Sequence, residues 1–450
     1  MKNSRLAILK GAVWTTGAYG LGQLLRIATN IALARFLAPE IFGIMVIVNA
    51  LKYGVDLIAD VGIGQNLIYN KNAEDPEFYN TAWTLQVIRG LLLFIAGIAA
   101  ALPVATFYHD KILVIIVPVT AIGFVLTGCT SISVFLLQRR FQIAKLNTFD
   151  IVITFIVTVA SVAVAYIMPT VWALVLGQLF GFALRMVGSF FLLPDLRINF
   201  TISKRYTWQI LRFGRWITIS SIAFFLSATF DRLYLASVVP LGLLGIYGVA
   251  RTISDMLTGL IARLGEIIVF PLIASHSNKL RADLREKLFA TRLKFLLVGG
   301  LGFSIFAATV DLPIKILLDQ RYNAAAWMLP VLLVGSWFSV LYSINQSTLL
   351  GLGKPVYSAL ANSLKFGCLL IGLPFSVTEH GLLGCIIVVT AAEILRYVSI
   401  LVGQIRECSS FGIQDLLVTL MVFIVIALLE WIRFVLRVGT PFDNFTISAM

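Results

Sequence analysis

Runs of about 20 mostly apolar residues follow one another along almost the whole chain, and they constrain the fold more than any motif does. A helix of this length crosses the hydrocarbon core of a bilayer. Clusters of polar residues, proline and glycine separate about thirteen such runs. The runs lie near 12–35, 41–64, 83–107, 112–137, 147–168, 171–193, 210–235, 241–267, 295–317, 327–350, 357–377, 382–404 and 413–436. We therefore expect an all-α, polytopic membrane protein.

Composition excludes a soluble protein. Of 450 residues, 59% are hydrophobic and only 13% are charged, whereas roughly a quarter of the residues of a soluble domain are charged. If the N-terminus is cytoplasmic, the inner segments hold about eighteen lysines and arginines and the outer ones about six. The net charge of +13 then reports membrane orientation. We expect a cytoplasmic N-terminus and no binding of nucleic acid, because no basic soluble face exists.

The chain carries a weak internal repeat. A shift of 202 residues places "LKGAVWTTGAYG" (Leu9 to Gly20) on "LRFGRWITISSI" (Leu211 to Ile222). The same shift places "LARFLAPEIFGIM" (from Leu33) on "LASVVPLGLLGIY" (from Leu235). An even number of predicted spans separates the copies, so both halves start from the same side of the membrane. Such repeats are related by an axis along the membrane normal, and the substrate cavity of a transporter lies between them.

Known catalytic and nucleotide-binding motifs are missing. The stretch "LLGLGKP" (Leu349 to Pro355) lacks the first glycine of a phosphate-binding loop and ends in proline. The three histidines fall in three different loops without the spacing of metal ligands. No nucleophile elbow is present. We therefore expect no enzymatic activity, no cofactor and no metal, and transport driven by an ion gradient or by the substrate gradient.

Several stretches together resemble the Wzx-type oligosaccharide flippase (polysaccharide transport) family of the multidrug/oligosaccharidyl-lipid/polysaccharide exporter superfamily. They are "LARFLAPEIFGIM", "DVGIGQNLIYNKN", "NTAWTLQVIRGLLL", "LQRRFQIAKLNTFDI", "VWALVLGQLFGFALR", "LRFGRWITISSIAFFLSATFDRLYLASVVPLGLLGIYGVARTI" and "LLGLGKP". The resemblance covers residues 9 to about 360. It departs from the family pattern at Thr229, where the family usually has asparagine, and relatives often carry one span more.

The resemblance implies two six-helix lobes that rock about a central cavity. We place the N-terminal lobe at 1–200, the C-terminal lobe at 201–405, and an extra span with a tail at 406–450. The implied substrate is an undecaprenyl-pyrophosphate-linked oligosaccharide, flipped from the cytoplasmic to the outer leaflet of the bacterial inner membrane. The implied partners are this lipid, the membrane and polysaccharide assembly proteins. We expect a monomer.

Charges near the middle of the predicted spans point to the ligand. Each costs roughly 2.5–3.5 kcal/mol at the bilayer centre, so we expect them to face the protein interior. Cations predominate, which favours an anionic ligand such as pyrophosphate, and the planar guanidinium of arginine suits phosphate. The candidate substrate-binding cations are Arg26, Lys52, Arg251, Lys365 and Arg185.

Acidic residues in the spans are candidates for coupling a proton or sodium ion, or for simple charge pairing. They are Asp56, Asp60, Asp255 and Glu393. Lys52 with Asp56 and Arg251 with Asp255 are four residues apart and would pair within one helix. Glu393 with Arg396 would do the same, and Asp60 could instead be a helix-end contact. Arg26 and Lys365 would need partners from another helix. Asp231 and Arg232 are candidates for an outer gate.

Two other functions stay open. A cation-coupled multidrug or small-solute exporter of the same superfamily would favour a carboxylate-rich cavity, whereas cations predominate here. A membrane-embedded polysaccharide polymerase or glycosyltransferase would need a large outer loop with catalytic groups, and the predicted outer turns are short.

Overall fold

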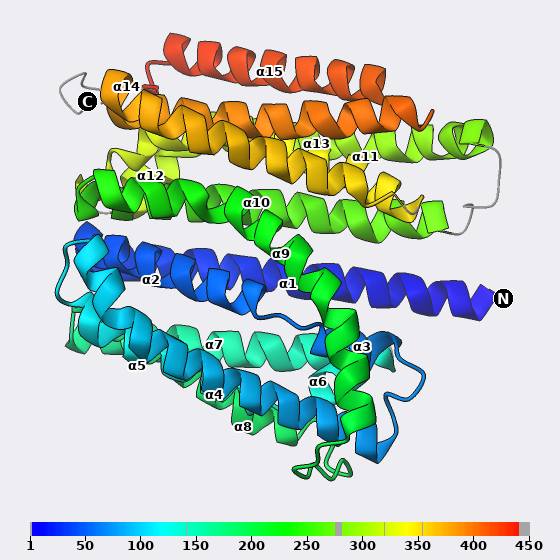
Figure 1. Cartoon of the computed structure of the whole chain (residues 1–450). Coiled ribbons are helices and arrows are strands. Elements are labelled where there is room, and N and C mark those ends of the chain that lie inside the picture. The colour runs from blue at the N-terminus through cyan, green and yellow to red at the C-terminus, as the bar shows by residue number, and fades with distance from the viewer. Residues whose placement is uncertain (1, 141, 275–280, 319, 353, 441–450) are drawn as a thin grey trace. The chain divides into compact units, whose positions relative to one another are not determined.

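The computed structural model describes residues 2–140, 142–274, 281–318, 320–352 and 354–440 (Figure 1). Throughout these ranges the regular elements are helices, which confirms the all-α fold class. The chain divides into two compact units, Met1–Gly242 and Leu243–Met450. The predicted lobe boundaries at 200 and 405 stay predictions.

The first unit holds nine helices within its described residues. They are α1 (Lys2–Phe36), α2 (Pro39–Ile58), α3 (Ile63–Tyr69), α4 (Pro76–Phe107), α5 (Leu113–Gly128), α6 (Ser133–Arg139), α7 (Ile143–Ile167), α8 (Val171–Phe190) and α9 (Lys204–Val238). Proline at the first position starts α2 and α4, where its missing N–H leaves no helical bond unmade. Asp75 caps α4 by accepting from the N–H of Glu77 at 3.1 Å.

The second unit holds nearly all of α10 (Leu241–Ala274) and the helices that follow it. These are α11 (Arg281–Thr309), α12 (Asp311–Leu317), the short 3₁₀ helix η1 (Gln320–Tyr322), α13 (Ala325–Gly351), α14 (Val356–Arg406) and α15 (Gly412–Val435). Helix α14 joins two predicted spans across a break at Gly381, which has φ 56° and ψ −145°. Only glycine adopts this backbone conformation readily.

Most of the predicted spans coincide with helices suited to a bilayer. Eight described helices are long and apolar enough to cross a membrane, or nine if the bent pair α5 and α6 forms one span. The long helices α1, α9 and α10 coincide with three further predicted spans, but they are less uniformly apolar. Helix α10, for example, contains Arg251, Asp255, Arg263 and Glu266. The total of about thirteen spans therefore stays a prediction.

Helices α4 and α5 of the first unit approach each other closely at two glycines. A Cβ atom on Gly90 would lie 2.5 Å from the carbonyl oxygen of Phe124, and one on Gly128 would lie 2.9 Å from that of Gln86. The segment between α8 and α9 runs alongside α4. Side chains of α4 accept its backbone N–H groups, Asn80 from Asn199 at 2.9 Å and Thr84 from Thr201 at 3.0 Å.

Buried ion pairs hold α15 within the second unit. Near its start, Asp415 lies 2.5 Å from the guanidinium of Arg292 in α11. Near its end, Arg433 binds both carboxylate oxygens of Asp311 in α12, at 2.7 and 2.8 Å. All four side chains are buried. The last predicted span is thus an integral part of this unit.

Candidate functional site

A broken helix forms one wall of a cavity in the first unit. Helices α5 and α6 meet at an angle of 52°. The side-chain amide of Gln86 in α4 donates at 2.9–3.1 Å to the carbonyl oxygens of Thr127, Gly128 and Thr130. Ser189 in α8 accepts the N–H of Ser131 at 2.8 Å. Non-helical backbone at membrane depth is tolerated only where protein buries it or where it lines a cavity.

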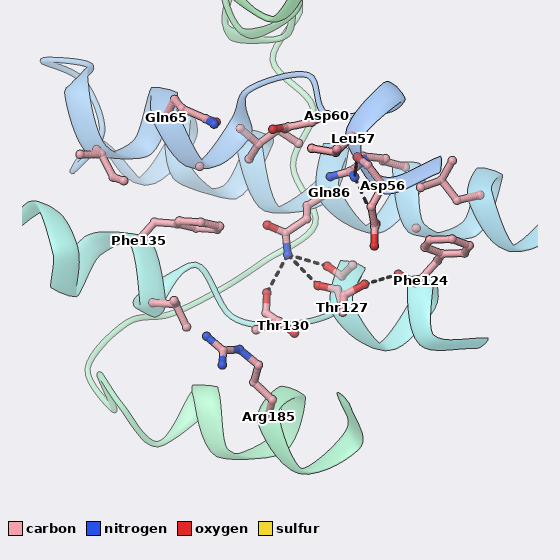
Figure 2. A pocket seen from close by; sticks show the side chains of 18 of the residues that line it. Asp56, Leu57, Asp60, Gln65, Gln86, Phe124, Thr127, Thr130, Phe135 and Arg185 are labelled. Atoms are coloured by element: carbon pink, nitrogen blue, oxygen red, sulfur yellow. Dashed lines mark hydrogen bonds and ion pairs between the residues drawn. The ribbon is translucent and has the colours of Figure 1, made fainter. Parts of the chain in front are cut away.

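The cavity beside this break has a volume of about 650 Å³ and is shown in Figure 2. This volume lies within the range of small-molecule sites, roughly 300–1,000 Å³. Its wall combines polar groups, such as Gln65 and Gln86, with the aromatic rings of Phe124 and Phe135. The charged residues that line it are Asp56, Asp60, Arg89 and Arg185.

Asp56 pairs with two cations at the cavity. The ammonium of Lys52 lies 3.1 Å from Asp56 Oδ2, as predicted for residues four apart on one helix. The guanidinium of Arg89 in α4 lies 3.4 Å from Asp56 Oδ1 and donates to its backbone oxygen at 2.8 Å. Lys52 also lies 4.5 Å from the ring centre of Phe182, within the range of a cation–π contact.

Arg185 and Asp60 have different local roles. Arg185 in α8 pairs with Asp150 in α7 at 2.6 Å. Asp60 follows the end of α2, and its Oδ1 accepts the N–H of Gly62 at 2.9 Å. This is the predicted helix-end contact, and Gly62 has a φ of 67°, which suits glycine. Asp60 nevertheless also faces the cavity.

Sequence reasoning missed Arg89, Asp150 and Gln86. The predicted charges were ranked by their distance from span midpoints, and Arg89 lies near the beginning of the run at 83–107. A cation anywhere inside an apolar run would have been a sufficient signal, because such a charge needs a polar partner. The roles of Gln86 and Asp150 depend on tertiary contacts that no local pattern indicates.

A buried cluster in the second unit surrounds Glu393, and we call it the Glu393 cluster. Its members are Arg251, Asp255, Lys365, Glu393 and Arg396. Lys365 Nζ lies 2.6 Å from Glu393 Oε1, and Arg251 and Arg396 each lie 3.5 Å from the carboxylate. These four side chains are between 3% and 8% exposed. Lys365, a candidate substrate-binding cation, therefore pairs with Glu393 of the next predicted span.

Two arginines of the Glu393 cluster have further partners. Arg251 Nε lies 3.4 Å from Asp255, the pair predicted at a spacing of four residues. The guanidinium of Arg396 lies 3.7 Å from the ring centre of Tyr342. Three cations thus face one buried carboxylate, with the exposed Asp255 at the edge.

The remaining candidates belong to neither group. Arg26 in α1 is exposed and forms no ion pair within the described part of the chain. Asp231 in α9 is buried and Arg232 is half-buried, and neither residue lines the cavity. In the portion of the chain that the structure describes, no three histidine, cysteine, aspartate or glutamate residues lie close enough to hold a metal ion.

Long apolar helices and a cavity with charged residues in its wall together define a multi-pass helical membrane protein. A family model described as "Polysaccharide biosynthesis protein" matches residues 32–327, and the chain belongs to this family. This assignment confirms the resemblance found from the sequence.

Curated relatives extend the similarity over most of the chain. A "Putative O-antigen transporter" of Shigella flexneri is 25% identical over 434 residues, which cover 90% of this chain and 100% of the relative. The "Teichuronic acid biosynthesis protein TuaB" of Bacillus subtilis is 25% identical and covers 77% of this chain and 71% of the relative.

Solved transporter structures have the same fold. A structure titled "Lipid II flippase MurJ, inward closed conformation" aligns with a TM-score of 0.73 at 13% identity, and covers 92% of each chain. An inward-facing multidrug resistance MATE family transporter aligns with a TM-score of 0.70 at 12% identity, over 88% of this chain and 98% of that one. The identities are low, so these structures support the fold alone.

Proposed function

We propose that this protein flips lipid-linked oligosaccharide units across the bacterial cytoplasmic membrane during surface polysaccharide assembly. The cavity at a broken helix, with charged and polar residues in its wall, in a chain of the polysaccharide biosynthesis family, carries this proposal. Relatives named as transporters of O-antigen and of succinoglycan support it. The substrate we favour is linked through undecaprenyl pyrophosphate, transport proceeds by alternating access, and the N-terminus is cytoplasmic.

The charges support an anionic substrate. The Glu393 cluster holds three cations and two carboxylates, Glu393 and the exposed Asp255, so a net positive charge remains that an anionic group nearby would balance. Arg26 adds an exposed cation that forms no ion pair among the described residues. Lys52 and Arg185 have carboxylate partners, which would compete with an anionic ligand for them. We therefore rank Arg26 above Lys52 and Arg185 as a site for the pyrophosphate.

The acidic candidates keep their proposed roles. Asp56, Asp60, Asp255 and Glu393 would either couple transport to a cation or balance neighbouring charges. Three of them, Asp56, Asp255 and Glu393, lie within ion-pair distance of cations, which favours charge balance. Asp60 is the strongest coupling candidate of the four. Asp231 and Arg232 stay candidates for an outer gate.

Substitution of Arg26 in the native host tests the proposal. We would express Arg26→Ala and Arg26→Lys in a deletion strain and quantify the membrane-inserted protein. Surface polysaccharide and lipid-linked units in the inner leaflet would then be measured. We expect Arg26→Ala to lose surface polysaccharide and accumulate lipid-linked units, with partial rescue by lysine. Arg140→Ala is the matched control, because Arg140 is exposed and, among the described residues, pairs only with the exposed Glu74 at 3.3 Å.

The deletion strain itself tests whether the protein is a flippase. If deletion neither reduces surface polysaccharide nor accumulates lipid-linked units, the flippase proposal is wrong, and a cation-coupled exporter becomes the better candidate. If deletion has both effects but Arg26→Ala transports normally at normal abundance, Arg26 has only a packing role.

A further inference from the structure

The cavity of the first unit is balanced in charge. Both arginines that line it have carboxylate partners, Arg89 with Asp56 at 3.4 Å and Arg185 with Asp150 at 2.6 Å. The nearby Lys52 shares Asp56. An anionic group in this cavity would have to compete with these carboxylates for each cation. The cavity is therefore poorly suited to a phosphate.

One wall of the cavity offers hydrogen-bonding groups that are not fully used. The carboxylate of Asp60 makes a single hydrogen bond within the described part of the chain, to the N–H of Gly62. Gln65 lies in the first turn of α3 and makes no side-chain hydrogen bond to any described residue. Figure 2 shows both on the same side of the cavity. An ionised carboxylate only accepts hydrogen bonds, whereas an amide both donates and accepts.

An aromatic ring lies near these groups. Phe135 of α6 lines the cavity, and its ring lies below Gln65 in Figure 2, packed against Gly64 of α3. Gly64 allows this position, because a Cβ atom there would lie 2.6 Å from the Phe135 ring. A carboxylate, an amide and an aromatic ring around one cavity match a sugar ring, which donates from its hydroxyl groups and presents an apolar C–H face.

We propose that the cavity of the first unit binds an uncharged sugar ring of the transported oligosaccharide. Asp60 and Gln65 hydrogen-bond its hydroxyl groups, and Phe135 packs against its C–H face. The Asp60 carboxylate disfavours phosphate here by repulsion, so the charged linkage of the substrate binds elsewhere. This assignment rests on the proposed flippase function and specifies which part of the substrate the cavity recognises.

The test uses the full-length protein in lipid nanodiscs and two ligands. One ligand is undecaprenyl pyrophosphate, which has no glycan, and the other is the glycan-bearing lipid extracted from the host. Asn keeps the oxygen that accepts from Gly62, so Asp60→Asn preserves the turn. We expect Asp60→Asn to weaken binding of the glycan-bearing lipid about tenfold and to leave binding of undecaprenyl pyrophosphate unchanged. Asp195→Asn, at an exposed position, is the matched control and changes neither affinity.

A second variant tests the aromatic contact. Phe135→Leu keeps an apolar side chain but removes the flat ring, and the loss should again be confined to the glycan-bearing lipid. The sugar assignment is wrong if Asp60→Asn and Phe135→Leu affect both ligands equally or affect neither. If the wild-type protein binds no glycan-bearing lipid at all, the flippase proposal itself fails. The two failures are therefore distinguishable.

Discussion

The Glu393 cluster predicts an asymmetry between removing its carboxylate and removing one of its cations. Glu393 is 3% exposed. Its carboxylate lies 2.6 Å from the ammonium of Lys365 and 3.5 Å from the guanidinium groups of Arg251 and Arg396. Glu393→Gln would leave three cations around a neutral side chain. Removal of one partner from a buried ion pair costs about 3–5 kcal/mol, because the remaining charge stays desolvated. We expect Glu393→Gln to lie within that range.

Lys365→Met should cost much less. Glu393 would keep Arg251 and Arg396, and the methionine would fill the space of the lysine stem. Replacement of a buried charge by an apolar side chain of similar volume is often nearly neutral when no charge is left unpaired. We expect a loss below about 2 kcal/mol. In the double variant, Lys365→Met should offset part of the loss caused by Glu393→Gln.

Thermal unfolding of the detergent-solubilised protein measures these differences, with tryptophan fluorescence and the monodisperse fraction after heating as two readouts. Glu74→Gln is the control, since the exposed pair of Glu74 with Arg140 should contribute at most about 1 kcal/mol. Equal destabilisation by Lys365→Met and Glu393→Gln would refute the reasoning, because it would mean that the cations do not depend on Glu393. Strict additivity in the double variant would also contradict it.

Three further predictions concern the fold. Arg433→Met should destabilise the protein by about 3–5 kcal/mol, because it removes the cation that binds both oxygens of the buried Asp311 carboxylate. An unchanged melting temperature would contradict a stabilising role of this ion pair. Gln86→Leu removes a side-chain donor that three carbonyl groups share and should cost about 1–3 kcal/mol. A fall in transport, measured by surface polysaccharide, should accompany it. The hydrogen bond of Tyr206 to Asp75 at 2.7 Å raises the pKa of Tyr206. This hydrogen bond stabilises the folded protein below the ordinary tyrosine pKa of about 10, and the stabilisation is lost as pH rises through the raised pKa of Tyr206. The wild-type protein should therefore lose stability in this alkaline range. Unfolding curves of Tyr206→Phe should lack this contribution to the loss.

The sequence by itself determined the class of protein and most of its helices. An apolar run of about 20 residues must satisfy its own backbone in a bilayer, and only a helix does so within one segment. Charge pairs four residues apart could also be predicted from the sequence, because the helical period places both side chains on one face. The contacts of Lys52 with Asp56 and of Arg251 with Asp255 are examples.

Only the tertiary structure decided which distant charges meet. Lys365 pairs with Glu393 across the break at Gly381, and Arg185 pairs with Asp150 from a neighbouring helix. The sequence indicated that such cations need partners, but a partner on another helix depends on how the helices rotate and cross. Helix packing sets that geometry through many small contacts along the whole interface. For the same reason, the cavity beside α5 and α6 could not be predicted, because its shape depends on where Gln86 holds the broken helix.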